Sequence, residues 1–159
     1  MTVSWVKGWV GATDGESSMA HWKVQTLSGN RHFDAGEHAR ALDYYQQALW
    51  LARQQFACWP DADEAVAALV VAHHNLADLL VAMTLPDRAA DMLCHVHDYL
   101  LATSQSPASP DPLRAAALRH SRGTRTELLA FVQKHGHHDG ILRCLGQCQC
   151  QTEPAHRLH

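Results

Sequence analysis

The chain has 159 residues, 47% of them hydrophobic and 18% charged, a balance typical of one globular domain with a buried core. Residues 37–110 carry three basic and nine acidic groups (−6), and residues 111–159 carry seven basic and four acidic groups (+3), within a formal net charge of −3. An acidic body argues against nucleic-acid binding, which needs a concentrated basic surface. No apolar run approaches the roughly 18–20 residues of a membrane helix, so we expect no membrane partner.

Five cysteines are an odd number, and their placement does not suggest a disulfide framework, because two are isolated and three crowd the C-terminus. A reducing, cytoplasmic location is the expectation. The N-terminal stretch "MTVSWVKGWV" is interrupted by a lysine and is not followed by a small-residue cleavage site, so it does not resemble a secretory signal. We expect residues 1–18, which end in the linker-like "GATDGESS", to be a flexible extension.

Five stretches show helical periodicity, and strand patterns are nearly absent. The expected helices span about residues 18–34, 37–56, 63–83, a stretch beginning at 86, and 112–134. The residues expected to face the core are Ala20, Val24 and Leu27 in the first helix; Ala41, Tyr45, Ala48, Ala52 and the flanking Leu42, Leu49 and Phe56 in the second; Val66, Leu69, His73, Leu76 and Leu80 in the third; Ala89, Leu93, Val96 and Leu100 in the fourth; and Leu113, Ala117, His120, Thr124, Leu128 and Phe131 in the fifth.

Helix-ending and helix-starting residues separate these stretches. Gly36 is placed to end the first helix, and Asp61 and Pro86 suit the start of the third and fourth. Asp111, followed by proline, predicts the start of the fifth helix after a linker. Residues 137–159 form a Cys/His-rich tail with no sustained periodicity apart from a short turn at "GILRCL".

The second and fourth helices repeat one pattern at an offset of 48 residues, in which small side chains alternate with bulky ones. Two antiparallel helices approach closely only where small residues on one helix meet large residues on the other, so we expect Gly29 and Ala41 to make room for Tyr45. The pairs related by the offset are Gly29 and Ala77, Phe33 and Val81, Ala41 and Ala89, Tyr45 and Leu93, and Ala48 and Val96.

The run Gly29, Gly36, Ala41, Tyr45 and Ala48 resembles a tetratricopeptide repeat (TPR), and the second copy resembles one more loosely. The expected tryptophan, leucine and closing proline of the family are missing, and the offset of 48 residues exceeds the usual ~34. A plain bundle of helical hairpins is the competing interpretation.

The resemblance implies an all-α fold, a right-handed superhelical stack of antiparallel hairpins. The domain would span residues 19–136, with repeats at about 20–57 and 61–103 and a capping helix at 112–134. It would act as a non-enzymatic adaptor, or a co-chaperone-like module, that binds a peptide or helix of another protein in a concave groove. No catalytic motif appears.

The resemblance also implies groove residues. Asn30 and Asn75 match asparagines that clamp the carboxylate end of a peptide in chaperone-binding members, whereas Thr26 stands where such members have lysine. Arg119 and Arg122 could approximate a basic pair. His73 lies on an apolar stripe, where a hydrogen-bonded core histidine is the stronger interpretation.

The helix at 112–134 also has one arginine-rich face, formed by Arg114, Arg119, Arg122 and Arg125. It is either a solvated surface or a docking face for an acidic partner or a second copy of the chain. Exposed ends of so short a stack would likewise favour a homo-oligomer. Gly123, in the middle of this helix, predicts a kink or a close contact.

The tail offers a second hypothesis, a metal-handling protein. Cys144, Cys148, Cys150 and His156 supply the nitrogen and sulfur ligands that zinc or copper(I) prefers. The spacing is Cys-x3-Cys-x-Cys rather than that of paired zinc knuckles, so a disordered terminus with incidental metal affinity is the competing interpretation.

Overall fold

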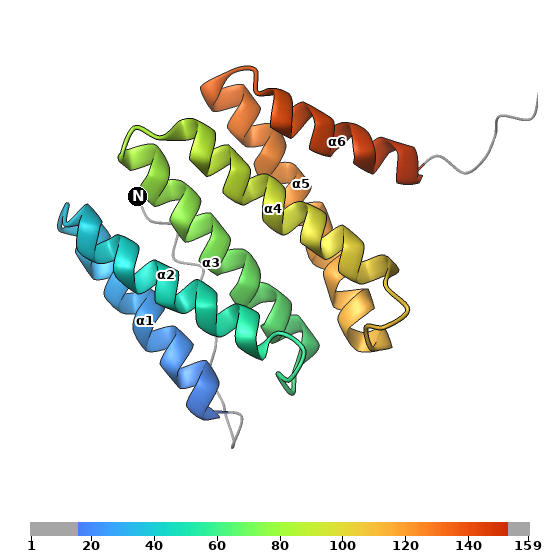
Figure 1. Cartoon of the computed structure of the whole chain (residues 1–159), viewed down its shortest axis with the longest axis horizontal. Helices are drawn as coiled ribbons and strands as arrows, with labels where there is room; N and C mark the ends of the chain where they lie inside the picture. The colour runs from blue at the N-terminus through green and yellow to red at the C-terminus, as the bar shows by residue number, and fades with distance from the viewer. Residues whose placement is uncertain (1–15, 153–159) are drawn as a thin grey trace, which may run out of the picture.

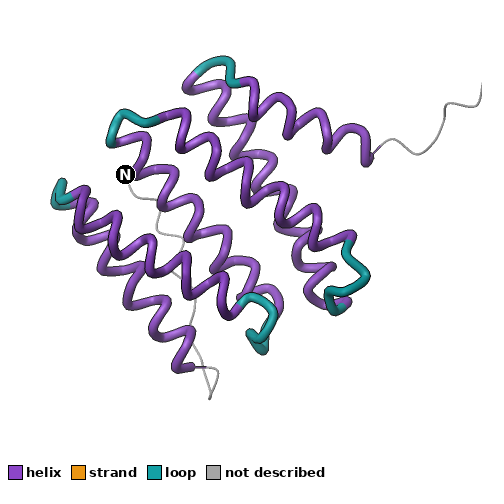
Figure 2. The backbone as a smooth tube through the Cα atoms, in the orientation of Figure 1, coloured by secondary structure: helices purple, strands orange, loops and turns teal. Residues whose placement is uncertain are grey.

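The structure is a computed structural model that describes residues 16–152, with side chains described for residues 19–146. Within this part of the chain every regular element is a helix, and short loops join consecutive helices (Figures 1 and 2). The all-α class predicted from the sequence is therefore confirmed. The helices are α1 (Glu16–Asp34), α2 (His38–Gln55), α3 (Ala62–Ala82), α4 (Pro86–Gln105), α5 (Asp111–His135) and α6 (Asp139–Thr152).

The turn and cap residues act as the sequence predicts. Gly36 adopts a φ of +75°, a left-handed conformation that glycine accepts readily, and the following amide of Glu37 donates to the carbonyl of His32 at 2.8 Å. At the start of α3, the Asp61 side chain accepts a hydrogen bond from the amide of Glu64 at 3.0 Å. These residues fix where α1 ends and where α3 begins.

Helix α3 is the centre of the bundle. It contacts α1, α2, α4 and α5, whereas the backbones of α2 and α4 do not contact each other within the described residues. Figure 1 shows α1 behind α2 and α5 behind α4, with α3 between the two pairs. Consecutive helices thus form hairpins that share one central helix.

The first hairpin closes through the nested pair that the sequence predicts. Gly29 of α1 lies against the ring of Tyr45 on α2, and a Cβ atom at Gly29 would collide with that ring. Tyr45 is only 2% exposed, and its hydroxyl donates to the Oδ1 atom of Asn30 at 2.6 Å. Ala41 is fully buried beside them. In the second hairpin the equivalent positions are also buried: Ala77, Ala89, Leu93 and Val96.

The predicted core face of α1 is wrong, although the predicted faces of α2, α3 and α4 are confirmed. Val24 and Leu27 are 58% and 48% exposed, whereas Trp22 and Thr26 are buried. Trp22 has the largest apolar surface on this helix and Gly29 must face Tyr45. Trp22 and Gly29 are seven residues apart, so they lie on the same face of the helix, and that face is buried. Val24 is two residues after Trp22 and therefore lies about 200° around the helix from the buried face.

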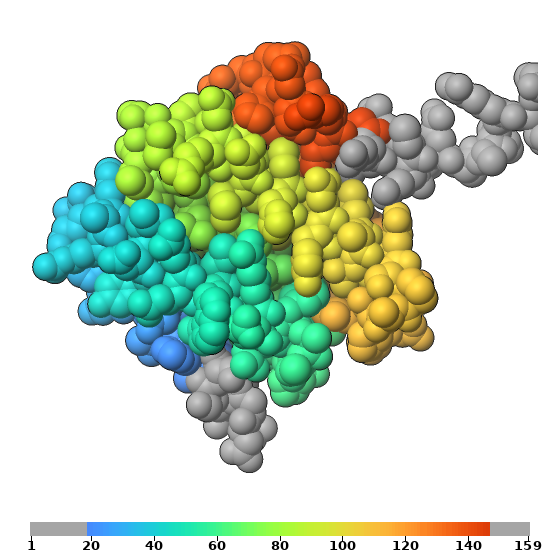
Figure 3. All heavy atoms as spheres, in the orientation of Figure 1, coloured from blue at the N-terminus to red at the C-terminus, as the bar shows by residue number. Residues whose placement is uncertain are grey.

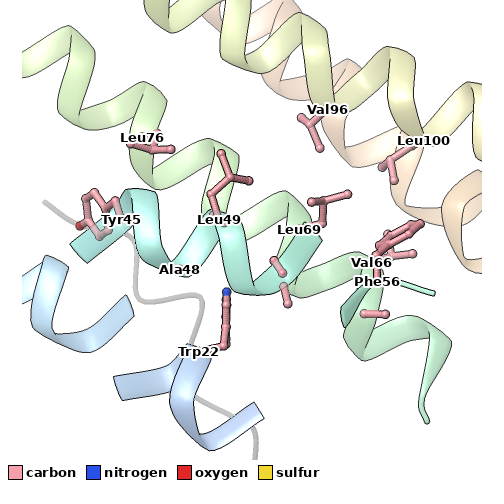
Figure 4. Close-up of a cluster of buried hydrophobic side chains, with 14 of the residues drawn as sticks. Trp22, Tyr45, Ala48, Leu49, Phe56, Val66, Leu69, Leu76, Val96 and Leu100 are labelled. Atoms are coloured by element: carbon pink, nitrogen blue, oxygen red, sulfur yellow. The ribbon is translucent and has the colours of Figure 1, made fainter. Parts of the chain in front are cut away.

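The core has two parts. The larger cluster joins α1, α2 and α3 to the middle of α4 and the start of α5, and includes Trp22, Tyr45 and Leu69. Figure 4 shows Trp22 reaching from α1 toward α2, and Val96 and Leu100 pointing from α4 toward α3. The smaller cluster lies where the end of α3 meets α4, α5 and α6; its members are Ala77, Leu80, Ala89, Ala90, Leu93, Leu128, Phe131, Ile141 and Cys144.

The apolar character of α3 corrects the expectation that no segment approaches membrane length. Among the described residues, α3 is long and apolar enough to cross a membrane by length and composition. More than half of its apolar window (56%) is buried inside the bundle, as in the core helix of a soluble protein. Four neighbouring helices provide that burial.

Helix α6 was not foreseen from the sequence pattern, which predicts only a short turn in this region. It packs on α4 and α5 through Ile141, which is fully buried, and Cys144, which is 3% exposed. The helix repeats apolar residues for only two turns, too short a run for periodicity to be clear. The smaller core cluster therefore includes part of the predicted tail.

Substitution of two glycines tests the nested seam. Gly29→Ala should destabilise the fold by about 1–2 kcal/mol, because the gain in helix propensity is outweighed by collision with Tyr45. Gly123→Ala, in an equally helical but open position, should instead stabilise the fold by about 1 kcal/mol. Urea unfolding of both variants provides the measurement. Equal effects of the two substitutions would contradict the proposed packing.

Candidate functional site

A groove of about 560 Å³ lies between α3 and α5. One wall is formed by a stripe of α3 residues spaced three or four apart, and the other wall is formed by α5. Because the stripe spans seven residues, the groove is about 10 Å long. The lining residues are Ala67, Val70, Val71 and His74 of α3, and Arg119, His120, Gly123, Thr124, Thr126 and Glu127 of α5.

His74 supplies a polar group at the apolar α3 wall. Its Nε2 atom is buried and has no hydrogen-bond partner within the protein. Burial lowers the pKa of His74 to about 4, so the ring is neutral near pH 7. A neutral imidazole offers either a donor or an acceptor, and a bound group could satisfy it.

Charged residues stand at one end of the groove. Arg119 of α5 donates to the Oδ1 atom of Asp63 on α3 at 2.9 Å, and the Nε2 atom of His120 lies 3.4 Å from the same oxygen. The hydrogen bond from Arg119 lowers the pKa of Asp63. All three side chains are at least 31% exposed, so the cluster joins the two walls at the rim without being buried.

Gly123 leaves the α5 wall open. It is exposed in the middle of α5, and a Cβ atom there would meet no atom within 4 Å. The expected close contact at Gly123 is therefore wrong. A glycine in mid-helix costs about 1 kcal/mol relative to alanine, and at this position the missing side chain leaves space in the groove.

The predicted groove residues do not form one site. Arg119 lines the groove, and Arg122 is exposed on the same helix outside the lining. Asn30 is engaged by the Tyr45 hydroxyl, and Thr26 is fully buried in the core with no partner for its Oγ1 atom. Asn30 and Thr26 are therefore structural residues of the first hairpin.

His73 and Asn75 are also placed outside this groove. His73 is 1% exposed and lies between α2 and α4; its Nδ1–H donates to the carbonyl of Leu69 at 2.8 Å, and Arg53 donates to its Nε2 atom at 3.5 Å. His73 is thus a hydrogen-bonded core histidine, the stronger of the two interpretations from the sequence, and it does not line the α3–α5 groove. Asn75 is half-buried on α3 and does not line the groove.

The arginine-rich face of α5 is divided by internal pairing. Arg114 donates to the carbonyl of Ser104 and to Asp111, and Arg119 pairs with Asp63. Arg122 and Arg125 are exposed. Internal pairing of Arg114 and Arg119 weakens the charge available to an acidic partner.

A second groove, of about 750 Å³, separates α2 from α4 above α3. Leu76 and Leu80 of α3 lie in its lining, and Trp50 of α2 is 60% exposed at its edge. Figure 3 shows the face that α2 and α4 form. This groove lies opposite the α3–α5 groove and provides an independent comparison for it.

Comparison with known proteins identifies the family. A family model described as "Protein of unknown function (DUF2753)" matches residues 20–158. The chain belongs to the DUF2753 family. No curated protein and no solved structure matches the chain.

Membership in DUF2753 overturns the expected membership in the TPR family. The nested glycine and alanine positions that carried the resemblance are present, but they meet the steric demand of any close antiparallel hairpin. The departures from the TPR pattern were the features that distinguished the two families. They are the missing tryptophan, leucine and closing proline, and the long offset. The clamp roles implied for Asn30 and Asn75 have no further support, since Asn30 binds Tyr45.

The metal hypothesis gains no support within the described residues. No group of three or more His, Cys, Asp or Glu side chains in that part of the chain is arranged to hold a metal ion. Cys144 faces the core rather than the solvent. The other predicted ligands, Cys148, Cys150 and His156, have side chains outside the described residues.

Three groove residues, His74, Val70 and Val71, were not predicted from the sequence. His74 follows His73 directly, and residues one apart on a helix point in directions about 100° apart, so only one of the two could lie on the α2–α4 side. The apolar residues at 67, 70, 71 and 74 form a second stripe on α3. That second stripe was the signal that α3 has neighbours on both sides.

Two neighbouring histidines on α3 make stability depend on pH, and His97, whose pKa burial also lowers, adds to the same dependence. Burial lowers the pKa of His73 and of His74 from 6.5 to about 4, so the unfolded chain binds more protons between these values. Their contribution is complete above pH 6.5 and is lost as the pH falls toward 4. Each histidine should remove about 1.4 kcal/mol from the free energy of unfolding by pH 5.5.

Urea unfolding at pH 7.5 and 5.5 measures this loss. His74→Leu replaces the unpartnered ring by an apolar side chain, so between the two pH values the variant should lose about 1.4 kcal/mol less stability than the wild type. Identical pH dependence in the variant and the wild type would show that His74 is not buried in its neutral form.

Proposed function

We propose that the chain is a non-enzymatic protein-interaction module that binds an amphipathic helix of another protein in the α3–α5 groove. The observation that carries this proposal is an open apolar groove with a buried, unpartnered histidine. Its volume of about 560 Å³ accommodates several side chains.

The shape of the groove favours a helix as the occupant. Its walls are two neighbouring helices, and the wall residues of α3 follow the spacing 67, 70, 71, 74. An apolar stripe spaced in the same way on a third helix would fill such a groove over two turns. The right-handed superhelical stacking expected from the sequence would place α1, α3 and α5 on one face, and it remains part of this proposal.

The polar groups would select among apolar helices. A serine, threonine or tryptophan on the partner could hydrogen-bond to the Nε2 atom of His74, which otherwise stays unsatisfied. Charged residues also border the groove: Glu127 lies in its lining, and the Arg119–Asp63 pair lies at its rim. These charges favour a partner with charged residues beside its apolar stripe. Apolar contact would supply affinity, and these groups would supply orientation.

Occlusion of the groove tests the proposal. Gly123→Leu places a bulky side chain into open space without a core collision, so the fold should persist while the groove is filled. Helical peptides selected from a displayed library against the wild type should carry one apolar stripe, and should bind Gly123→Leu at least ten-fold more weakly. Binding is measured by fluorescence anisotropy.

Two matched variants serve as controls. Gly123→Ala keeps most of the groove open and should retain binding, and Trp50→Ala alters only the opposite groove and should also retain it. Full binding by Gly123→Leu would contradict the proposed site. Loss of binding in Trp50→Ala alone would place recognition on the α2–α4 face instead.

A further inference from the structure

Two cysteines from different helices meet where α6 packs on the body of the bundle. Cys144 of α6 lies against Cys94 of α4, with its Sγ atom 4.0 Å from the carbonyl oxygen of Cys94. One turn further along α4, the Oδ1 atom of Asp98 lies 3.1 Å from the same sulfur. The group is separate from the α3–α5 groove.

The surroundings give the two thiols different protonation. The neighbouring Cys144 thiol lowers the pKa of Cys94, with the charge of Arg143 acting in the same direction. The same interaction, burial and the Asp98 carboxylate raise the pKa of Cys144. Cys144 therefore holds its proton more tightly than Cys94, and Cys94 has the greater thiolate character.

Exposure assigns the order in which the thiols can react. Cys94 is partly exposed, whereas Cys144 is 3% exposed. A reagent from solution therefore reaches Cys94 first. Cys144 lies beside it, in position to attack any adduct that forms on Cys94.

We propose that Cys94 and Cys144 are a reversible thiol–disulfide site that takes a small-molecule disulfide such as oxidised glutathione. The Cys94 thiolate attacks one sulfur of the reagent, the reagent's S–S bond breaks, and one glutathione leaves as a thiolate. Cys144 then gives up its proton and attacks Cys94 in the mixed disulfide, and the second glutathione leaves. In total, two protein thiols and one oxidised glutathione become one protein disulfide and two reduced glutathiones.

The new bond would fasten α6 to α4. Within the described residues α6 contacts only α4 and α5, and no helix follows it to cover its outer side there. The link would join residues 50 positions apart, and closing a loop of this length in the unfolded chain stabilises the folded state. Oxidation is thus expected to hold the smaller core cluster together.

Treatment with oxidised glutathione at pH 7.5 tests the proposal, with reduced protein as the starting material. A Cys148→Ser/Cys150→Ser background prevents exchange with the two neighbouring cysteines. The intact mass should fall by about 2 Da. Peptide mapping without reduction should link Cys94 to Cys144, and the melting temperature should rise by roughly 5 °C or more. Dithiothreitol should reverse all three changes.

Single variants separate the two roles. Cys144→Ala should stop at one stable glutathione adduct on Cys94, whereas Cys94→Ser should leave Cys144 unmodified. Cys58→Ser, which removes an exposed cysteine outside the pair, should behave as the wild type. A disulfide through Cys58, or no link between Cys94 and Cys144 while the protein stays folded, would overturn the proposal.

Discussion

The burial of α3 on several sides constrains the whole bundle. A helix of 21 residues with so few charged groups must be covered by protein, and α1, α2, α4 and α5 cover it. The backbones of α2 and α4, and those of α1 and α5, do not contact each other in the described chain. Phe56, directly after α2, packs edge-on against Tyr99 of α4, and both pairs are otherwise held in place by their contacts with α3.

The α2–α4 groove follows from this arrangement. Where helices pack on one central helix without meeting each other, a channel floored by the central helix is left between them. The α3–α5 groove forms where the α5 wall has a glycine, and the buried polar ring of His74 lies at its apolar side. The packing of helices around α3 that stabilises the fold thus also forms the α3–α5 groove, the surface for which we propose partner binding.

Much of the fold could be predicted from local pattern. Caps and glycines placed the helix limits within a few residues, and the repeat of small and bulky positions located the seam of Gly29 and Tyr45. The face of α1 could not be read from periodicity, because Val24 and Leu27 form as regular a stripe as Trp22 and Thr26. The contact of Gly29 with Tyr45 on α2 decides which of the two stripes is buried.

The candidate site was much less predictable. Arg119 was found because a family resemblance pointed to it, but that resemblance was wrong. Asn30 has a polar side chain that looks free in the sequence and is engaged in the fold. The α3–α5 groove and the Cys94–Cys144 pair depend on which helices become neighbours across 45 residues or more, and local spacing does not encode that choice.

Native-state hydrogen exchange tests the central position of α3 most directly. The account predicts that amides in the middle of α3, around Leu69 and Leu76, exchange the slowest in the described chain and only through global unfolding. Amides of α6 should exchange faster, by local opening. Exchange in the middle of α3 that is as fast as in α6 would contradict the account.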